Sequence, residues 1–240
     1  MKLQRRVALI TGASRGLGLE IARLYAARGA RLILTARGAA ALEAAAEELG
    51  RHSDVVALPG DVADRRHAER LVRAGLERFG QIDILVNNAS LLGPSPMPML
   101  EGYPPDVLDD VLRANAVAPL HLAQLVLPGM RAHGEGVILN VTSDAGVEAY
   151  PGWGGYGASK AALEQLSRVL AVELEGTGVR VYVVDPGDMD TQMHREAEPG
   201  EDLSHLPPPS VSAPAFVGLV EDERASFGRF VAQQLVSASR

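Results

Sequence analysis

Two side chains that could move a proton stand four residues apart in the second half of the chain. Tyr156 and Lys160 open a helical run, so they share one helix face with Cβ atoms roughly 5–6 Å apart. A lysine charge about 4 Å from a phenol, at an effective dielectric near 20, could lower the tyrosine pKa by up to ~3 units. Ser143 follows a strand-like run and could hydrogen-bond a substrate oxygen. This set predicts general acid–base chemistry at a carbon–oxygen bond.

A glycine-rich turn near the N-terminus could hold a dinucleotide. The turn reads Thr11-Gly12-Ala13-Ser14-Arg15-Gly16-Leu17-Gly18 and joins the first strand-like run to the first helical pattern. Glycine permits a tight turn and a close approach to a pyrophosphate, and the helix N-terminus offers unpaired N–H groups. A purely structural turn is the alternative, and the position between strand and helix favours nucleotide binding. Beside such a turn, the Tyr156–Lys160 pair is more than a surface cation–hydroxyl pair.

The residues after the second strand-like run indicate which dinucleotide is bound. A site specific for NAD carries a carboxylate here to hold the ribose 2′-hydroxyl. This chain has Ala36 followed by Arg37, and the glycine turn brings Arg15 to the same region. Two guanidinium groups without a carboxylate favour a 2′-phosphate, because arginine binds phosphate with two hydrogen bonds. The sequence therefore predicts NADP(H) in preference to NAD(H).

Short apolar runs alternate with helical patterns along the chain. The predicted strands are Val7–Ile10, Arg31–Thr35, Val55–Leu58, Ile82–Val86, Val137–Val141 and Val179–Val184, with a last candidate at Arg229–Val231. Runs that are apolar throughout indicate strands covered on both faces. We therefore predict an α/β fold in one domain over residues 1–240: a Rossmann-type, doubly wound parallel sheet of about seven strands with helices on both faces.

Two proline-rich segments interrupt this alternation. Leu91–Pro105 contains five prolines, and Gly187–Pro214 is polar and contains Pro207-Pro208-Pro209. Loops this long in a compact α/β domain usually bind ligands or cover a site. Both follow strands, so they belong to the carboxyl edge of the sheet, where such folds bind ligands. We expect Gly187–Pro214 to form a substrate lid, followed by a helix at about Pro214–Val220.

Composition excludes several classes of protein. The 240 residues contain no cysteine, which excludes disulfides, thiolate metal sites and a thiol nucleophile. The formal charge is −7, which argues against nucleic acid or an anionic membrane as a partner. No run has the length and composition of a membrane span or a signal peptide, and we expect a cytoplasmic protein. The six histidines form no metal-ligand spacing, and no G-x-S-x-G hydrolase turn is present.

Taken together, these motifs resemble those of the short-chain dehydrogenases/reductases from about residue 7 to residue 191. Thr11–Gly18 is similar to that family's cofactor turn, and Tyr156-Gly157-Ala158-Ser159-Lys160 is a close match to its catalytic helix. The resemblance implies a catalytic set of Asn115, Ser143, Tyr156 and Lys160. It also implies cofactor contacts from Gly12, Ser14, Arg15, Gly16, Leu17, Gly18, Arg37, Asp61, Val62, Asn88, Ala89, Tyr156, Lys160, Pro186, Gly187 and Thr191, with no metal.

The same resemblance implies how these residues would act in hydride transfer. Tyr156 would exchange a proton with the substrate oxygen, Ser143 would hold that oxygen, and Lys160 would tune the phenol and bind the nicotinamide ribose. Asn115 would hold a water linked to Lys160. Ser90 replaces the family's usual glycine, a change from which we expect little effect, and Asp185 replaces the commoner asparagine or alanine. The frequent C-terminal Val-Asp-Gly-Gly is missing, which leaves dimer and tetramer both open.

The long helix and the lid add expectations about assembly and substrate. Apolar positions of the predicted helix Tyr156–Glu175 cover roughly 220° at 100° per residue, more than one sheet face requires, which predicts a homo-oligomer. The expected pocket walls are mostly apolar: Leu91, Leu92, Ala145, Trp153, Met189 and Met193. They favour a small, neutral carbonyl compound or secondary alcohol. A 3-oxoacyl-thioester reductase and a dinucleotide-sensing protein without turnover are the alternatives.

Overall fold

The computed structural model describes residues 1–222 and 227–238, and in these ranges it contains one sheet of seven strands. The strands are β1 (Val7–Thr11), β2 (Arg31–Thr35), β3 (Val55–Ala57), β4 (Ile84–Asn87), β5 (Gly136–Val141), β6 (Val179–Asp185) and β7 (Phe227–Val231). Their order is β3-β2-β1-β4-β5-β6-β7, and every neighbouring pair is parallel. The predicted doubly wound α/β fold is confirmed. The strand order runs outward from β1 to β3 on one side and from β4 to β7 on the other, so it reverses between β1 and β4. Ligands bind at such a switch point.

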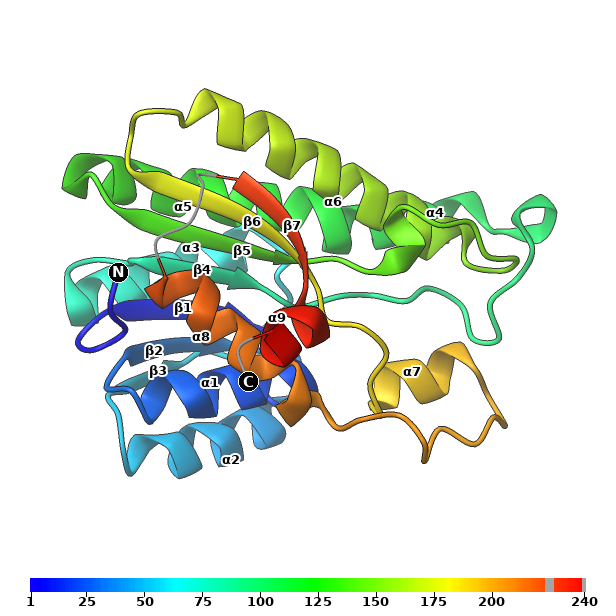
Figure 1. The fold of residues 1–240 in the computed structure, drawn as a ribbon, viewed down its shortest axis with the longest axis horizontal. Helices are drawn as coiled ribbons and strands as arrows, with labels where there is room; N and C mark the ends of the chain where they lie inside the picture. The colour runs from blue at the N-terminus through cyan, green and yellow to red at the C-terminus, as the bar shows by residue number, and fades with distance from the viewer. Residues whose placement is uncertain (223–226, 239–240) are drawn as a thin grey trace.

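Helices cover both faces of the sheet because its strands are apolar on both sides. One core cluster joins the sheet to α1 (Gly16–Ala26), α2 (Ala39–Gly50) and α8 (Ala213–Glu221). A second cluster joins the other face to α3 (Arg65–Phe79), α5 (Ala118–His133) and α6 (Gly154–Glu173). The strands carry the residues of both clusters alternately, as in Leu9 and Ile10 of β1. The result is a sheet between two helical layers (Figure 1).

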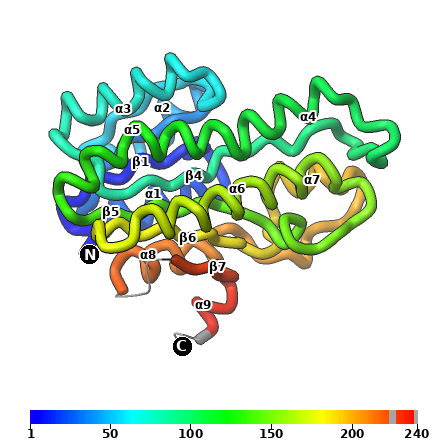
Figure 2. Tube along the Cα trace, turned by 90° about the horizontal axis from the view of Figure 1, so that it is seen from above, coloured from blue at the N-terminus to red at the C-terminus, as the bar shows by residue number. Residues whose placement is uncertain are grey.

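The predicted loops contain more structure than the sequence pattern suggested. Leu91–Pro105 includes a 3₁₀ turn at Leu100–Gly102 and ends where α4 (Pro105–Leu112) begins. The predicted lid contains α7 (Gln192–Ala197), and α9 (Ala232–Ala238) follows β7. Both α4 and α7 lie at the end of the molecule away from the N-terminus (Figure 1, Figure 2). This is the carboxyl edge of the sheet.

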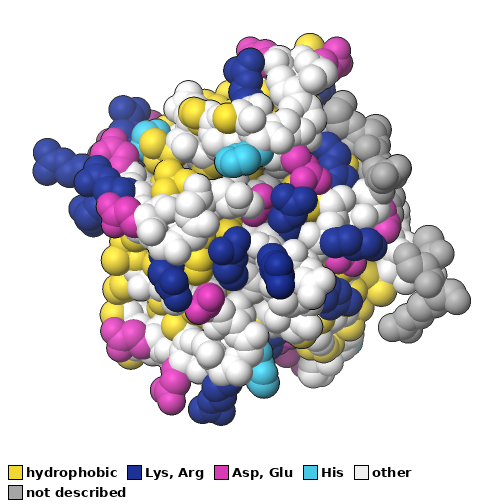
Figure 3. All heavy atoms as spheres, turned by 90° about the vertical axis from the view of Figure 1, so that its left-hand side faces the viewer, with side chains coloured by type: hydrophobic (Ala, Val, Ile, Leu, Met, Phe, Trp, Pro, Cys, Tyr) yellow, Lys and Arg dark blue, Asp and Glu magenta, His cyan; other side chains and the backbone are white. Residues whose placement is uncertain are grey.

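The opposite edge is stabilised by ion pairs. Arg6, which precedes β1, donates to Asp83 at 3.1 Å and to Glu135 at 2.6 Å, and so joins the starts of β1, β4 and β5. The Asp83 carboxylate also accepts the backbone N–H of Val7 at 2.8 Å. Basic side chains with acids between them mark this face (Figure 3). It carries none of the predicted site residues.

The outer face of α6 exposes apolar side chains. Leu166, Val169 and Val172 are 36%, 46% and 63% exposed, whereas Leu163 and Ala171 of the same helix are buried. The surplus apolar arc expected from the sequence therefore faces solvent in this chain. Separately, no helix within residues 1–222 and 227–238 combines the length and apolar character that crossing a membrane requires.

Candidate functional site

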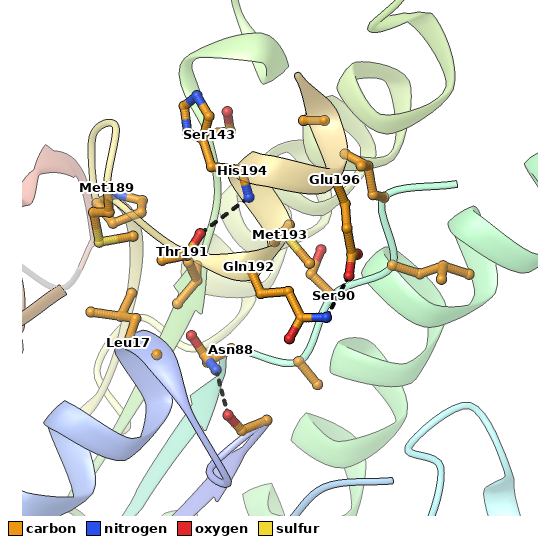
Figure 4. A pocket seen from close by; sticks show the side chains of 18 of the residues that line it. Leu17, Asn88, Ser90, Ser143, Met189, Thr191, Gln192, Met193, His194 and Glu196 are labelled. Atoms are coloured by element: carbon orange, nitrogen blue, oxygen red, sulfur yellow. Dashed lines mark hydrogen bonds between the residues drawn. The ribbon is translucent and has the colours of Figure 1, made fainter. Parts of the chain in front are cut away.

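A cleft of about 1720 Å³ opens along the carboxyl edge of the sheet. The loops after β1, β4 and β5 form its floor, and the lid residues 187–209 form its roof. In Figure 4 the lid side chains of Thr191, Gln192 and Met193 point toward Asn88 and Ser90 on the floor. The cleft is long enough to hold an extended ligand that reaches from Arg37 to Trp153, both of which line it.

The glycine turn brings α1 very close to β1. Gly12 has φ +65°, and a Cβ on it would lie 2.7 Å from Nδ2 of Asn88. A Cβ on Gly18 would lie 2.4 Å from the carbonyl oxygen of Gly12. No larger residue fits either position without moving backbone. The turn therefore directs the N-terminus of α1 into the cleft, where its free N–H groups favour an anion.

Asn88 and Thr11 connect this turn to the loop after β4. The Asn88 amide donates to the carbonyl oxygens of Thr11 at 3.0 Å and Gly12 at 3.2 Å. In return, the Thr11 hydroxyl accepts the backbone N–H groups of Asn88 at 3.0 Å and Ala89 at 2.9 Å. These four bonds span β1 and β4 at the switch point of the sheet. They fix the two loops that a dinucleotide would contact.

At the end of the cleft away from Trp153, the basic residues lie on exposed loops. Arg15 and Arg37 both line the cleft and are exposed, and Asp61 and Val62 line it beside them. Arg15 does not lie free: its guanidinium donates to the side-chain carbonyl of Gln192 in α7. The glycine turn is thereby linked to the lid across the cleft.

Tyr156 and Lys160 lie in the first two turns of α6 and are buried, with 8% and 2% exposure. The Lys160 ammonium donates to the carbonyl oxygen of Val141 at 2.9 Å and lies 5.3 Å from the centre of the Tyr156 ring. Burial lowers the pKa of Lys160 to about 8. The Lys160 ammonium has three N–H groups, and one of them is used in the bond to Val141. Two N–H groups therefore remain to donate to a ligand.

The pKa of Tyr156 differs from the sequence expectation. Pairing with Lys160 predicts a lowered pKa, and this prediction is wrong. Burial is the largest effect and raises the pKa to about 12; hydrogen bonding to Ser90 lowers it, while the charges of Asp185 and Asp144 raise it further. Desolvation of the phenolate outweighs the nearby cation.

Ser143 sits at the start of a 3₁₀ turn after β5. Its hydroxyl donates to Oδ1 of Asp144 at 2.9 Å and accepts the backbone N–H of Ala145 at 3.2 Å. Asp144 also accepts the Tyr150 hydroxyl at 2.9 Å. Ser143 lines the cleft together with Tyr156 and Lys160. The three side chains that the sequence singled out therefore come together.

Asn115 lies in a π-helical turn (Arg113–Val117) between α4 and α5. Its Oδ1 accepts from the Ser90 hydroxyl at 3.1 Å and from the Leu91 N–H at 2.7 Å. Its Nδ2 donates to the Leu91 carbonyl at 2.8 Å and to the Ser159 hydroxyl at 2.9 Å. The side chain thus uses both lone pairs and both N–H groups on protein. It joins the loop after β4 to α6 and has no group left for the water that the resemblance implied.

A group of charged residues behind Ser143 was not found by sequence reasoning. Arg229 of β7 donates to Glu164 of α6 at 3.1 Å, to Asp185 at 3.4 Å and to the carbonyl oxygen of Ser143 at 3.3 Å. Glu164 also accepts the Thr142 hydroxyl at 2.8 Å. Both carboxylates are buried, and burial raises the pKa of Asp185. The unusual Asp185 was the one signal in the sequence.

The part of the cleft around Tyr156 and Trp153 is apolar. A small cluster of buried residues contains Leu92, Ala145, Tyr156 and Ala197, with Met97 and Trp153 packed against it. The rings of Trp153 and Tyr156 meet edge to face with centres 5.9 Å apart. All six predicted wall residues line the cleft. Ala197 brings the lid helix onto this cluster.

The lid is held by polar contacts of its own. Thr191 caps α7 by accepting the His194 N–H at 3.2 Å, and Gln192 donates to Glu196 at 2.8 Å (Figure 4). Ser95, in the loop after β4, donates to the Glu196 carbonyl at 2.7 Å. Arg195 pairs with Asp190 within the lid.

Most of the predicted site residues line this cleft. The exceptions are Asn115, which lies behind it, and Gly18, which packs against Gly12. Those that line it are Gly12, Ser14, Arg15, Gly16, Leu17, Arg37, Asp61, Val62, Asn88, Ala89, Ser143, Tyr156, Lys160, Pro186, Gly187 and Thr191.

Comparisons with known proteins agree with this geometry. A family model described as short chain dehydrogenase matches residues 6–202. Over 190 residues the chain is 39% identical to 2-(R)-hydroxypropyl-CoM dehydrogenase of Xanthobacter autotrophicus, covering 78% of this chain and 76% of that protein. It is 39% identical over 198 residues to a 3-oxoacyl-acyl-carrier-protein reductase of rhamnolipid biosynthesis from Pseudomonas aeruginosa, covering 80% and 76%. A short chain dehydrogenase from Shigella flexneri, solved in complex with NADP, superposes with a TM-score of 0.84 at 31% identity over 97% of this chain and 99% of that one.

Proposed function

Because this chain belongs to the short-chain dehydrogenase family, we propose that it transfers a hydride between NADP(H) and the carbonyl or secondary-alcohol carbon of a small, mostly apolar substrate. The observation that carries the proposal is the meeting of Ser143, Tyr156 and Lys160 in one cleft with the glycine turn. A protein that only senses dinucleotides needs the turn but not the acid–base set. Turnover over a panel of ketones and alcohols, with either cofactor, separates the two functions.

The residues of the cleft suit a dinucleotide. The space that Gly12 and Gly18 keep free of side chains, beside the N-terminus of α1, suits a pyrophosphate. Arg15 and Arg37 would hold a 2′-phosphate, and Asp61 and Val62 would face the adenine. The remaining contacts would come from Asn88, Ala89, Pro186, Gly187 and Thr191, which line the cleft nearer to Tyr156.

Side chains of this protein would position the substrate oxygen and exchange a proton with it. When bound, the nicotinamide supplies or accepts the hydride. In reduction, Tyr156 donates its phenolic proton to the substrate oxygen; a pKa of about 12 keeps that proton on the phenol at neutral pH. Ser143 positions the same oxygen. Lys160 carries its charge below about pH 8, favours the phenolate left behind, and has N–H groups free for ribose hydroxyls.

Cofactor preference is a direct test of the two exposed arginines. We expect NADP⁺ to bind at least about tenfold more tightly than NAD⁺, because charge-assisted hydrogen bonds to the 2′-phosphate are absent with NAD⁺. Arg37→Asp should shift the preference toward NAD⁺. Fluorescence titration of both cofactors measures this, with Arg73→Asp, the same charge change on the exposed side of α3, as control. Tighter NAD⁺ binding by the wild-type protein contradicts the prediction.

The substrate class follows from the apolar walls and the charge of the lid. Residues 188–206 carry six acids and one arginine, Arg195, and that arginine is already paired with Asp190. A negative roof disfavours acyl-carrier-protein and coenzyme A thioesters, whose phosphates require basic partners. We expect a higher kcat/KM for a small aryl ketone than for a 3-oxoacyl thioester. The reverse order would favour the second candidate function, that of the Pseudomonas aeruginosa relative.

The exposed apolar face of α6 should be buried in a homo-oligomer. Leu166, Val169 and Val172 present a continuous apolar surface, and a twofold axis would pair it with the same helix of a second copy. We expect at least a dimer by light scattering at micromolar concentration. Val169→Glu should dissociate it, because the charge would be buried without a partner. A monomeric wild-type protein at that concentration refutes the prediction.

A further inference from the structure

Arg229 of β7 bonds to three elements at the carboxyl edge of the sheet from a position behind the cleft. β7 pairs with β6, and Arg229 lies opposite Val183 (Figure 1). Its Nε donates to both carboxylate oxygens of Glu164 in α6, at 3.1 and 3.3 Å. Its Nη2 donates to Asp185 at 3.4 Å and to the carbonyl oxygen of Ser143 at 3.3 Å. One planar guanidinium therefore connects the loop after β5, the helix α6 and the end of β6.

The turn that begins at Ser143 is held in place by this contact. The Ser143 carbonyl oxygen accepts the Gly146 N–H at 3.1 Å as well as the Arg229 guanidinium. The first bond is local and closes the turn, whereas the second joins the turn to another strand. Gly146 lies against α6, since a Cβ there would lie 3.1 Å from Cβ of Lys160 and 3.3 Å from Oε1 of Glu164. The turn is thus fixed on the part of α6 that carries Lys160.

The charges of this group require an arginine. The side chains of Glu164 and Asp185 are 6% and 8% exposed, and that of Arg229 is 26% exposed. Glu164 accepts the Thr142 hydroxyl at 2.8 Å, and Asp185 accepts the Gly187 N–H at 2.9 Å. Two buried carboxylates without a cation are strongly unfavourable. A planar guanidinium donates in several fixed directions at once, which a single ammonium does not.

We propose that Arg229 is a positioning residue for the proposed reaction: it holds the backbone of Ser143, and with it the Ser143 hydroxyl, in register with Tyr156. The proposal rests on the proposed roles of Ser143 and Tyr156 at one substrate oxygen. These two side chains come from different elements, the loop after β5 and α6. Arg229 joins the two elements through the Ser143 carbonyl and Glu164. A misplacement of about 1 Å caused by a change away from the reacting atoms can cost about 10²-fold in rate.

The test uses two variants of the full chain, Glu164→Gln/Arg229→Met and Arg229→Lys. The double variant removes a positive and a negative charge together, so that Asp185 alone loses its cation. Arg229→Lys keeps the charge and loses the planar fork. We expect kcat to fall by roughly 10- to 10²-fold in the double variant and by less in Arg229→Lys. The dissociation constant for NADP⁺ should stay nearly unchanged in both.

Arg180→Met is the matched control for a purely structural arginine. Arg180 of β6 also donates to a backbone carbonyl, that of Val220 in α8 at 2.9 Å, and the cleft residues do not include it. We expect this variant to lower Tm without a change in kcat. A fall in kcat that followed Tm in all three variants would therefore overturn the positioning role of Arg229.

Two further measurements identify Ser143 as the residue through which Arg229 acts. Hydrogen exchange of the backbone N–H groups of residues 142–147 should become faster in both Arg229 variants and stay unchanged in Arg180→Met. In a Ser143→Ala background, Glu164→Gln/Arg229→Met should lower kcat further by no more than about twofold, because the residue that it positions is gone.

The outcomes separate this proposal from the proposed function. Unchanged hydrogen exchange in both Arg229 variants overturns the positioning role, as does wild-type kcat in both. A further fall of the full size in the Ser143→Ala background also overturns it. Full turnover in Tyr156→Phe would instead overturn the proposed function, and hydrogen exchange would still report whether Arg229 holds the Ser143 turn.

Discussion

Tyr156→Phe is expected to lower kcat by roughly 10²–10⁴-fold, the usual size of a lost general acid. The change removes one oxygen from a side chain that is 8% exposed and keeps the ring packed against Trp153. The dissociation constant for NADP⁺ should therefore stay nearly unchanged. Steady-state turnover of a ketone, with cofactor titration in parallel, measures both quantities.

Tyr103→Phe is the matched control for this variant. The Tyr103 hydroxyl is buried, and within the part of the chain that the structure describes it has no hydrogen-bond partner. Removing an unpaired hydroxyl breaks no bond, so folding and turnover should be preserved. If Tyr156→Phe were as active as Tyr103→Phe, another group would have to supply the proton.

Lys160→Met should reduce both kcat/KM and NADP⁺ affinity, with kcat/KM lower by about 10²-fold at neutral pH. Methionine fills nearly the same buried volume, so the loss reports the missing charge and N–H donors. Lys2→Met is the control, because Lys2 is the other lysine of the sequence and is exposed. Simultaneous measurement of binding and turnover distinguishes this variant from Tyr156→Phe, which should affect turnover alone.

The pH dependence of the Lys160→Met effect has a definite sign. Burial lowers the pKa of Lys160 to about 8, so the charged form predominates below that pH and is lost above it. The ratio of wild-type to variant kcat/KM should be largest below pH 8 and should narrow as the pH rises through it. A constant ratio from pH 6 to about pH 9 would mean that the charge of Lys160 does not contribute.

Local sequence patterns predicted the sheet well because the five inner strands are buried on both faces, and only the edge strands β3 and β7 are partly exposed. Every predicted strand overlaps an observed one, and Arg31–Thr35 has identical bounds. The N-terminus of α3 also follows from local sequence, since the Asp64 carboxylate accepts the Arg66 N–H at 2.9 Å and caps the helix. Propensity and burial favour the same structure in these segments.

Short helices escaped prediction because distant contacts stabilise them. α7 has six residues, too few to be stable by itself, and it is held by Arg15 and Ser95 from other parts of the chain. The π-helical turn around Asn115 likewise follows from its bonds to Leu91 and Ser159. No periodicity of the local sequence encodes these partners.

In the candidate site, the positions of the residues could be predicted from the sequence, whereas their pKa values could not. Motif spacing brought Ser143, Tyr156 and Lys160 together in advance, because each follows a strand or opens a helix at one edge of the sheet. Their electrostatics could not be predicted, because burial and the charges of Asp144 and Asp185 set the pKa of Tyr156. These effects depend on three-dimensional distances that the motif does not contain.

The guanidinium of Arg229 has a consequence for how the protein is made. Ribosomes deliver a chain from its amino end, so the strands β1 to β6 can assemble before Arg229 is available. Until β7 pairs with β6, the carboxylates of Glu164 and Asp185 lack the cation that joins them to the Ser143 carbonyl. Two buried carboxylates without a cation are unfavourable, so we expect this edge of the sheet to remain hydrated until Arg229 is in place. We therefore expect the group formed by Glu164, Asp185 and Arg229 to be complete only after β7 pairs with β6.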